Sequence, residues 1–185
     1  MQIFRTTSTA AILAMLVMVP SALADDTTGG ASPGDPAPPV ISTPTTPTVA
    51  GSRVVIKGGL AYAPAAAPLS IKKVIWAGNK IRSLPYIWGG GHAAWLARGY
   101  DCSGSVSFAL HGGGLIRQTM VSGELASFGD RGKGQWITVF ANGGHVFMVV
   151  AGARFDTSGA SSARSRWQKN MRSGSGYAVR HPRGL

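Results

Sequence analysis

Cysteine is nearly absent from the sequence. Cys102 is the only one in 185 residues, so the chain cannot form an internal disulfide. In an exported protein an unpaired thiol is open to oxidation, which makes a purely structural role a poor explanation for it. It lies in the segment Tyr100-Asp101-Cys102-Ser103-Gly104, just after a glycine-rich turn. This context favours a nucleophile over a packing residue.

Acidic residues are also scarce. The chain has 7 Asp and Glu against 18 Lys and Arg, a formal net charge of +11. Beyond Gly51 the only acids are Asp101, Glu124, Asp130 and Asp156. A basic surface attracts polyanions, which for an exported chain would be anionic cell-wall polymers; solubility alone is the alternative. Nucleic-acid binding is not predicted, because a helical basic stripe, an aromatic stacking motif and zinc-ligand spacing are all missing.

The histidines do not form a metal-binding pattern. His92, His111 and His181 have no partner at the close spacing of a zinc site, and the only thiol is better explained as a nucleophile. We therefore expect no metal and no cofactor.

A long apolar run occurs only near the start of the chain. Arg5 precedes the apolar residues 10–19, and Ala22-Leu23-Ala24 is typical of a signal-peptidase site. A membrane anchor is the alternative, but Pro20 interrupts a run already shorter than the roughly 20 residues that span a bilayer. We predict a signal peptide at residues 1–24, a secreted or cell-wall-associated protein, and no stable membrane insertion after cleavage.

Two further segments follow the predicted signal peptide. Residues 25–50 are rich in Thr, Pro, Gly, Ser and Ala, a composition that cannot bury enough apolar surface to fold, so we predict a flexible tether. Residues 51–185 are long enough for one domain with its own core.

The hydrophobic pattern predicts an α+β domain, with helices first and an antiparallel sheet second. A helical face is compatible with residues 69–81 and a buried helix with residues 103–110. Short β-branched or aromatic runs, separated by glycine-bearing turns, predict strands at 53–57, 136–140, 145–151, 154–157 and 177–181.

This order of elements bears on the chemistry of the thiol. If Cys102 begins a helix, unpaired backbone amides and the positive end of the helix dipole favour its thiolate. His145 follows the flexible Asn142-Gly143-Gly144 and leads an apolar strand. We expect His145 to hydrogen-bond the sulfur and to protonate a leaving amine.

Three motifs in order resemble the NlpC/P60 family of cell-wall peptidases. They are Pro85-Tyr86-Ile87-Trp88-Gly89-Gly90, Asp101-Cys102-Ser103-Gly104 before an apolar helix, and Gly144-His145-Val146 at the start of a strand. The resemblance covers about residues 71–157.

The resemblance implies a papain-like core, in which N-terminal helices pack on a small antiparallel sheet. It also implies hydrolysis of peptidoglycan stem peptides, most often between D-glutamate and the diamino acid. Cys102 would be the nucleophile and His145 the base. Tyr86 would lie near the sulfur, where we expect its hydroxyl to assist the oxyanion, and Asp101 and Ser103 match positions that in some members meet the substrate's amino terminus.

Two departures from the family leave alternatives open. The usual Gly-Asp-hydrophobic lead into the histidine hairpin is replaced by residues 134–140, and the usual place for the residue that orients the histidine is Thr157. An amidase or acyltransferase with the same Cys-His pair is one alternative. A non-catalytic wall-binding module of the same fold is the other.

The residue that orients His145 is expected on the next strand. If Gly152-Ala153 forms the turn, Asp156 lies opposite Val149 and needs a bulge or a strong twist to reach the imidazole. Ser158 would be nearer, but a carboxylate both fixes the tautomer and stabilises the imidazolium. We therefore favour Asp156.

Overall fold

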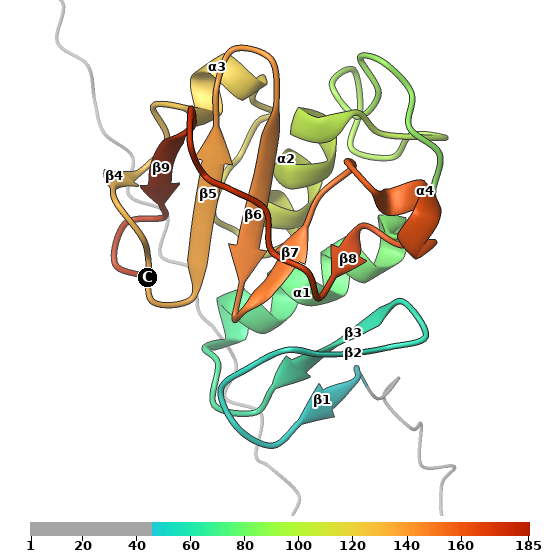
Figure 1. Cartoon of the computed structure of the whole chain (residues 1–185), viewed down its shortest axis with the longest axis vertical. Helices are drawn as coiled ribbons and strands as arrows, with labels where there is room; N and C mark the ends of the chain where they lie inside the picture. The colour runs from blue at the N-terminus through green and yellow to red at the C-terminus, as the bar shows by residue number, and fades with distance from the viewer. Residues whose placement is uncertain (1–45) are drawn as a thin grey trace, which may run out of the picture. The chain divides into compact units, whose positions relative to one another are not determined.

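The computed structural model describes residues 46–185 (Figure 1). The predicted signal peptide and residues 25–45 of the predicted tether lie outside the described residues. Within residues 46–185 no helix has the length and apolar character needed to cross a membrane.

A small three-stranded sheet begins the described part of the chain. Strands β1 (Thr48–Val49), β2 (Val55–Lys57) and β3 (Leu60–Pro64) are ordered β1-β3-β2, with β1 parallel and β2 antiparallel to β3. Strand β1 falls within the range assigned to the tether, because a two-residue strand carries too little pattern to be seen in a Thr- and Pro-rich segment. Only β2 corresponds to a predicted strand.

Two main helices follow, α1 (Leu69–Ile81) and α2 (Cys102–Gly112), and they pack on each other. Both lie where the hydrophobic pattern predicts them. Two single-turn helices, α3 (Ser122–Leu125) and α4 (Ala160–Ala163), were not predicted.

The second half of the domain forms a six-stranded antiparallel sheet, as the pattern predicts. Its order is β4-β9-β5-β6-β7-β8. The strands are β4 (Asp130–Arg131), β5 (Ile137–Ala141), β6 (Val146–Val150), β7 (Ala153–Phe155), β8 (Trp167–Gln168) and β9 (Ala178–His181). The domain is therefore mixed α+β.

The main core lies between this sheet and the two long helices, which cover one face of it (Figure 1). Alternation along β6 sends Val146, Met148 and Val150 into the core with no exposed surface. They meet apolar residues from α1 and α2, among them Ile71, Val74, Ile75, Ala109 and Leu110. Contact of α2 with β6 brings the start of that helix to the start of that strand, where Cys102 and His145 lie.

Candidate active site

Cys102 is the first residue of α2, as predicted, and it is partly buried. Asp101 is the N-cap: its backbone is extended and its carboxylate accepts a hydrogen bond of 2.6 Å from the amide of Gly104. The sulfur therefore lies among the unpaired amides at the positive end of the helix.

The glycines around this helix start are required for close packing. The amide of Asp101 donates to the carbonyl of Gly90 at 3.2 Å. A Cβ atom at Gly104 would overlap the same carbonyl oxygen, and one at Gly91 would overlap the ring of Tyr100. The glycine-rich segment therefore packs closely against the turn of α2 that carries the thiol.

His145 stands directly before β6, and a local turn holds its backbone. The side chain of Asn142 accepts hydrogen bonds from the amides of Gly144 at 3.0 Å and His145 at 2.9 Å. The imidazole Nε2 lies 2.9 Å from Oδ1 of Asp156, and the ring is close enough to Cys102 for the two groups to shift each other's pKa values. Because Asp156 takes Nε2, the nitrogen left for the sulfur is Nδ1.

Asp156 reaches His145 without a bulge, and the expected hairpin register is wrong. The turn is Ala151-Gly152, one residue earlier than expected, and both residues have positive φ, 44° and 83°. In this register Val150 pairs with Ala153 and Met148 with Phe155. Extending it places Asp156 opposite Phe147 rather than Val149, one step from His145 on the same face of the sheet.

Asp156 is almost fully buried, with 2% of its surface exposed. Its Oδ1 also accepts from the amide of Ser158 at 2.8 Å, while Oδ2 lies 3.1 Å from Nη1 of Arg172 and 3.6 Å from Nε of Arg154. The hydroxyl of Ser158 lies 3.4 Å from Nε2 of His145, a longer contact than the one from the carboxylate. Of the two candidate orienting residues, Asp156 therefore makes the shorter contact, and it also brings the charge.

The three ionisable groups shift one another's pKa values. Hydrogen bonds to Asp156 and Cys102 raise the pKa of His145 from 6.5 to about 9, against the effect of burial. Burial would raise the pKa of Cys102, but the hydrogen bond from His145 and the backbone of Val146 lower it overall. Burial also opposes ionisation of Asp156, yet hydrogen bonds from His145, the Ser158 amide and Arg172 hold its pKa below the usual range. These directions favour a thiolate–imidazolium pair beside an ionised carboxylate.

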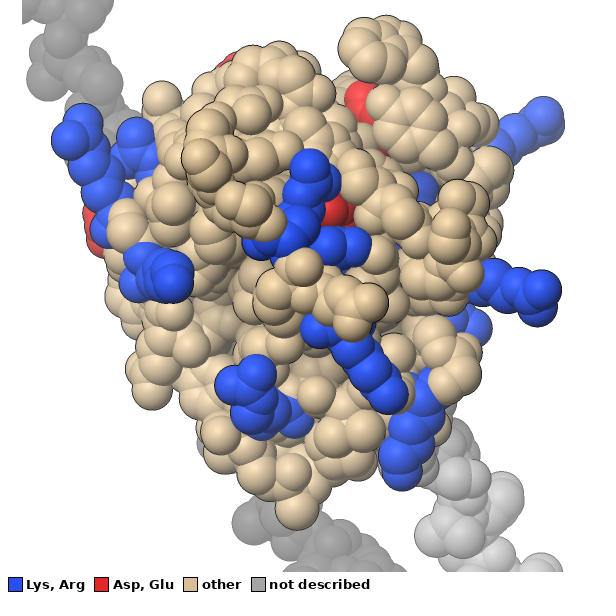
Figure 2. Space-filling model, viewed as in Figure 1, with Lys and Arg blue, Asp and Glu red and all other residues tan. Residues whose placement is uncertain are grey.

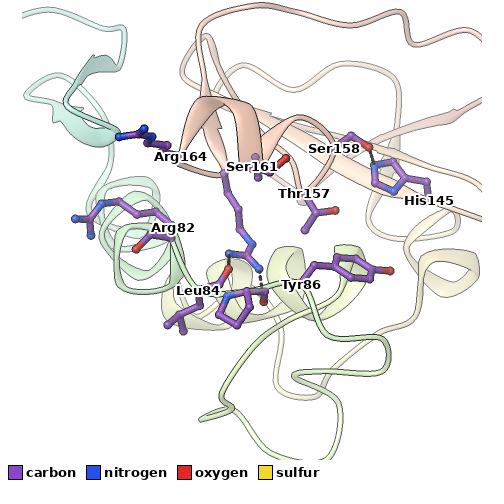
Figure 3. Close-up of a pocket in the computed structure, with 12 residues that line it drawn as sticks. Arg82, Leu84, Tyr86, His145, Thr157, Ser158, Ser161 and Arg164 are labelled. Carbon is purple, nitrogen blue, oxygen red and sulfur yellow. Dashed lines mark hydrogen bonds between the residues drawn. The ribbon is translucent and has the colours of Figure 1, made fainter.

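A groove of about 700 Å³ adjoins this arrangement, within the size range of ligand pockets (Figure 3). His145, Thr157 and Ser158 line one part of it and Tyr86 lies close by. Tyr86 is half exposed. Burial and the neighbouring charges of Cys102 and Asp101 raise the pKa of Tyr86, so its hydroxyl stays protonated near the sulfur. Its role as an oxyanion donor stays a prediction.

Asp101 and Ser103 are buried and bonded within the protein. Besides the helix cap, Asp101 accepts from the amide of Gly89 at 3.2 Å, and its Oδ1 lies 3.1 Å from both the hydroxyl of Ser103 and Nε2 of His92. Nε2 of His92 also lies 3.1 Å from the hydroxyl of Ser103. Contact of Asp101 and Ser103 with substrate stays a prediction, while their observed role is to hold the glycine loop against α2.

Three site residues were missed by the sequence reasoning. His92 had been considered only as a metal ligand, and no motif marks Arg172 or Arg166. Arg166 has 1% of its surface exposed, and its guanidinium donates five hydrogen bonds, to the Ser105 hydroxyl and to four backbone carbonyls. The carbonyls belong to Ile81, Leu84, Pro85 and Tyr100, so this one side chain joins the segment before Tyr86 to the segment before Cys102.

Within residues 46–185 there is no group of three or more His, Cys, Asp and Glu side chains that could hold a metal ion. Comparison with protein-family models, with curated proteins and with solved structures found no match to the chain.

Proposed function

We propose that the protein is an exported cysteine peptidase of the NlpC/P60 type, with a papain-like core, that hydrolyses peptidoglycan stem peptides. The observation that carries the proposal is the linked series Cys102, His145 and Asp156, with a helix start under the sulfur and an open groove beside the imidazole. Unrelated hydrolases that form acyl-enzymes use the same logic of nucleophile, base and orienting group. The sequence resemblance supplies the substrate class.

In the proposed reaction the thiolate of Cys102 attacks a peptide carbonyl carbon and forms a tetrahedral oxyanion. The amide of Cys102, which has no partner within its helix, donates to that oxyanion, together with the Tyr86 hydroxyl. The imidazolium of His145 then gives its proton to the leaving amine, and a thioester remains on the sulfur. Neutral His145 next takes a proton from water, which hydrolyses the thioester to a free acid and restores the thiolate–imidazolium pair.

Asp156 acts through His145. Its Oδ1 fixes the imidazole so that Nδ1 faces the sulfur, and its charge stabilises the imidazolium. The proposal needs no cofactor, and it places the protein in the secreted or wall-associated compartment.

The proposal is tested by incubating the mature protein, from Asp25 onward, with a stem peptide and weighing the products by mass spectrometry. We expect a cut between D-glutamate and the diamino acid, and no cut with Cys102→Ala. A Cys102-dependent cut at another bond identifies an amidase instead. Uncut peptide retained on wall material by both proteins would show a binding module and refute the hydrolase.

A further inference from the structure

The groove beside His145 has a basic end. In Figure 3 Arg82 and Arg164 lie at the opposite end of the lining from His145, with Thr157 and Ser161 between them. The third arginine in the lining is the buried Arg166. Among residues 46–185 no Asp or Glu lines the groove, so no acid from this part of the chain offsets these charges in its wall.

The three arginines differ in the hydrogen bonds that they have left to give. All five N–H donors of the Arg166 guanidinium are bonded to protein oxygens. Arg166 therefore contributes positive charge to the groove but has no hydrogen bond left to give to a ligand. Arg82 gives one bond, from Nη1 to the carbonyl of Asn79 at 2.9 Å. Within residues 46–185 neither Arg82 nor Arg164 has an acid in ion-pair range, whereas Arg154, Arg172 and Arg183 each pair with an aspartate.

Arg164 is also held in an unusual backbone conformation. It ends α4 with a φ of 52°, one of two non-glycine residues with positive φ in the described part of the chain. That conformation costs energy for an L-residue and is kept only where the surroundings enforce it, which happens often at ligand sites. Arg164 ends the short helix and is one of the residues that line the groove; in Figure 3 its guanidinium group and that of Arg82 point to the outer end of the groove, away from His145.

We propose that this end of the groove binds a free carboxylate of the substrate, on a part of the peptide distant from the bond that Cys102 attacks. The proposal rests on the proposed function, because it takes the groove to be the substrate cleft. Guanidinium groups bind carboxylates with two parallel hydrogen bonds, and the uncompensated charge of Arg166 strengthens the local positive potential. D-Glutamate and a diamino acid both carry a carboxyl group beyond those in peptide bonds, so a stem peptide offers the ligand that this end selects.

The test measures binding by the Cys102→Ala protein, so it does not require catalysis. Calorimetry would compare the free stem peptide with peptides in which one carboxylate at a time is converted to an amide. We expect one of these amides to bind about tenfold more weakly. In the Arg82→Gln/Arg164→Gln background, the free peptide should also bind about tenfold more weakly, and amidation should make no further difference.

The matched control is Arg117→Gln/Arg183→Gln, which removes two exposed charges that do not line this groove. It should keep the preference for the free carboxylate, since it changes the net charge by the same amount and breaks only the exposed ion pair of Arg183 with Asp130. Equal affinity for all the peptides, no binding of any of them, or a preference that survives in Arg82→Gln/Arg164→Gln would overturn the proposal.

The two proposals can fail separately. Cleavage by the unmodified protein without any carboxylate preference overturns the carboxylate site and leaves the peptidase. An arginine-dependent preference in binding, without cleavage by the unmodified protein, supports the carboxylate site and refutes the peptidase.

Discussion

Replacing Asp156 by Asn should raise the pH at which Cys102 becomes a thiolate. The hydrogen bond from His145 to this carboxylate is the largest cause of the raised pKa of His145, which is about 9. While the imidazole is protonated it holds the sulfur as a thiolate, so the pKa of Cys102 is lowered. Asn keeps the size of the side chain but removes the charge. The imidazolium then loses its proton at lower pH, and the thiol keeps its proton to higher pH.

The size of the effect follows from the pKa of His145. A rise from 6.5 to about 9 corresponds to about 3 kcal/mol of preference for the imidazolium. If Asp156 supplies roughly half of it, about 1.5 kcal/mol, its loss lowers the ratio of the thiolate–imidazolium pair to the thiol–imidazole pair about tenfold. The effect is confined to pH values between the lowered pKa of Cys102 and the raised pKa of His145, where the pair holds one proton.

Because Cys102 is the only cysteine, alkylation by iodoacetamide followed by mass spectrometry reports on this thiol alone. We expect the wild type to react faster than Asp156→Asn between about pH 7 and 8, by up to about tenfold, and the two rates to converge near pH 10, where both sulfurs are ionised. The greater intrinsic nucleophilicity of a more basic thiolate offsets part of the difference. A ratio of the two rates that stays constant from pH 6 to pH 10 would refute the reasoning.

Two controls separate the charge from its surroundings. Ser158→Ala removes the 3.4 Å contact to the same imidazole nitrogen but no charge, so its alkylation rate should change less than about twofold. Asp156→Asn leaves two arginines without their carboxylate, so near-UV circular dichroism should first establish that it folds. If it does not fold, Asp156→Asn/Arg172→Gln removes one of those charges and is expected to show the same alkylation profile.

Two further predictions concern the framework of the site. Arg166→Met should lower the free energy of unfolding by about 3–5 kcal/mol, measured by urea denaturation, because it leaves four backbone carbonyls without their donor; a loss below about 1 kcal/mol would contradict this. Arg166→Lys should be intermediate, since an ammonium group cannot reach all five acceptors. Gly104→Ala should slow alkylation of Cys102 and destabilise the fold by about 1–3 kcal/mol, because its Cβ overlaps the carbonyl of Gly90. Gly123→Ala, with nothing within 4 Å of the added Cβ, is the matched control: it should leave the alkylation rate unchanged and should not lower the stability, since Ala is the better helix former.

The main elements could be predicted because their signals are local. The helix at residues 69–81 coincides with α1, since apolar residues at helical spacing mark its buried face. The start of α2 was predicted near Cys102 from the apolar run that follows, and the structure adds Asp101 as its cap. These signals also placed the thiol and His145 at ends of elements that pack together.

The remaining features depend on contacts between distant residues. Two-residue turns of positive φ favour Asn-Gly or Asp-Gly, so nothing in Ala151-Gly152 marked the turn. The turn was therefore misplaced by one residue, which shifted the expected strand pairing by two residues. Arg166 contacts carbonyls 66 to 85 residues away along the chain, which no local pattern reveals. Strands β4 and β8 have only two residues each and are defined by their partners rather than by their own sequence.

Basic residues are in excess both on the surface of the domain and around the buried Asp156. Figure 2 shows Lys and Arg scattered over one face with few acids among them, and Asp156 faces three basic side chains. The contacts divide its oxygens: Arg172 and Arg154 lie on Oδ2, which leaves Oδ1 for His145 and the amide of Ser158. The arginines therefore fix the carboxylate without displacing the imidazole.

That arrangement has a cost and a consequence. Burial of His145 disfavours an imidazolium, yet the pKa of His145 is raised to about 9, so the hydrogen bonds to Asp156 and Cys102 outweigh the burial. The same positive surroundings stabilise any anion beside the imidazole. In the proposed reaction these anions are the thiolate before attack and the oxyanion after it, so the excess of basic residues favours both the resting nucleophile and the charge that develops during the reaction.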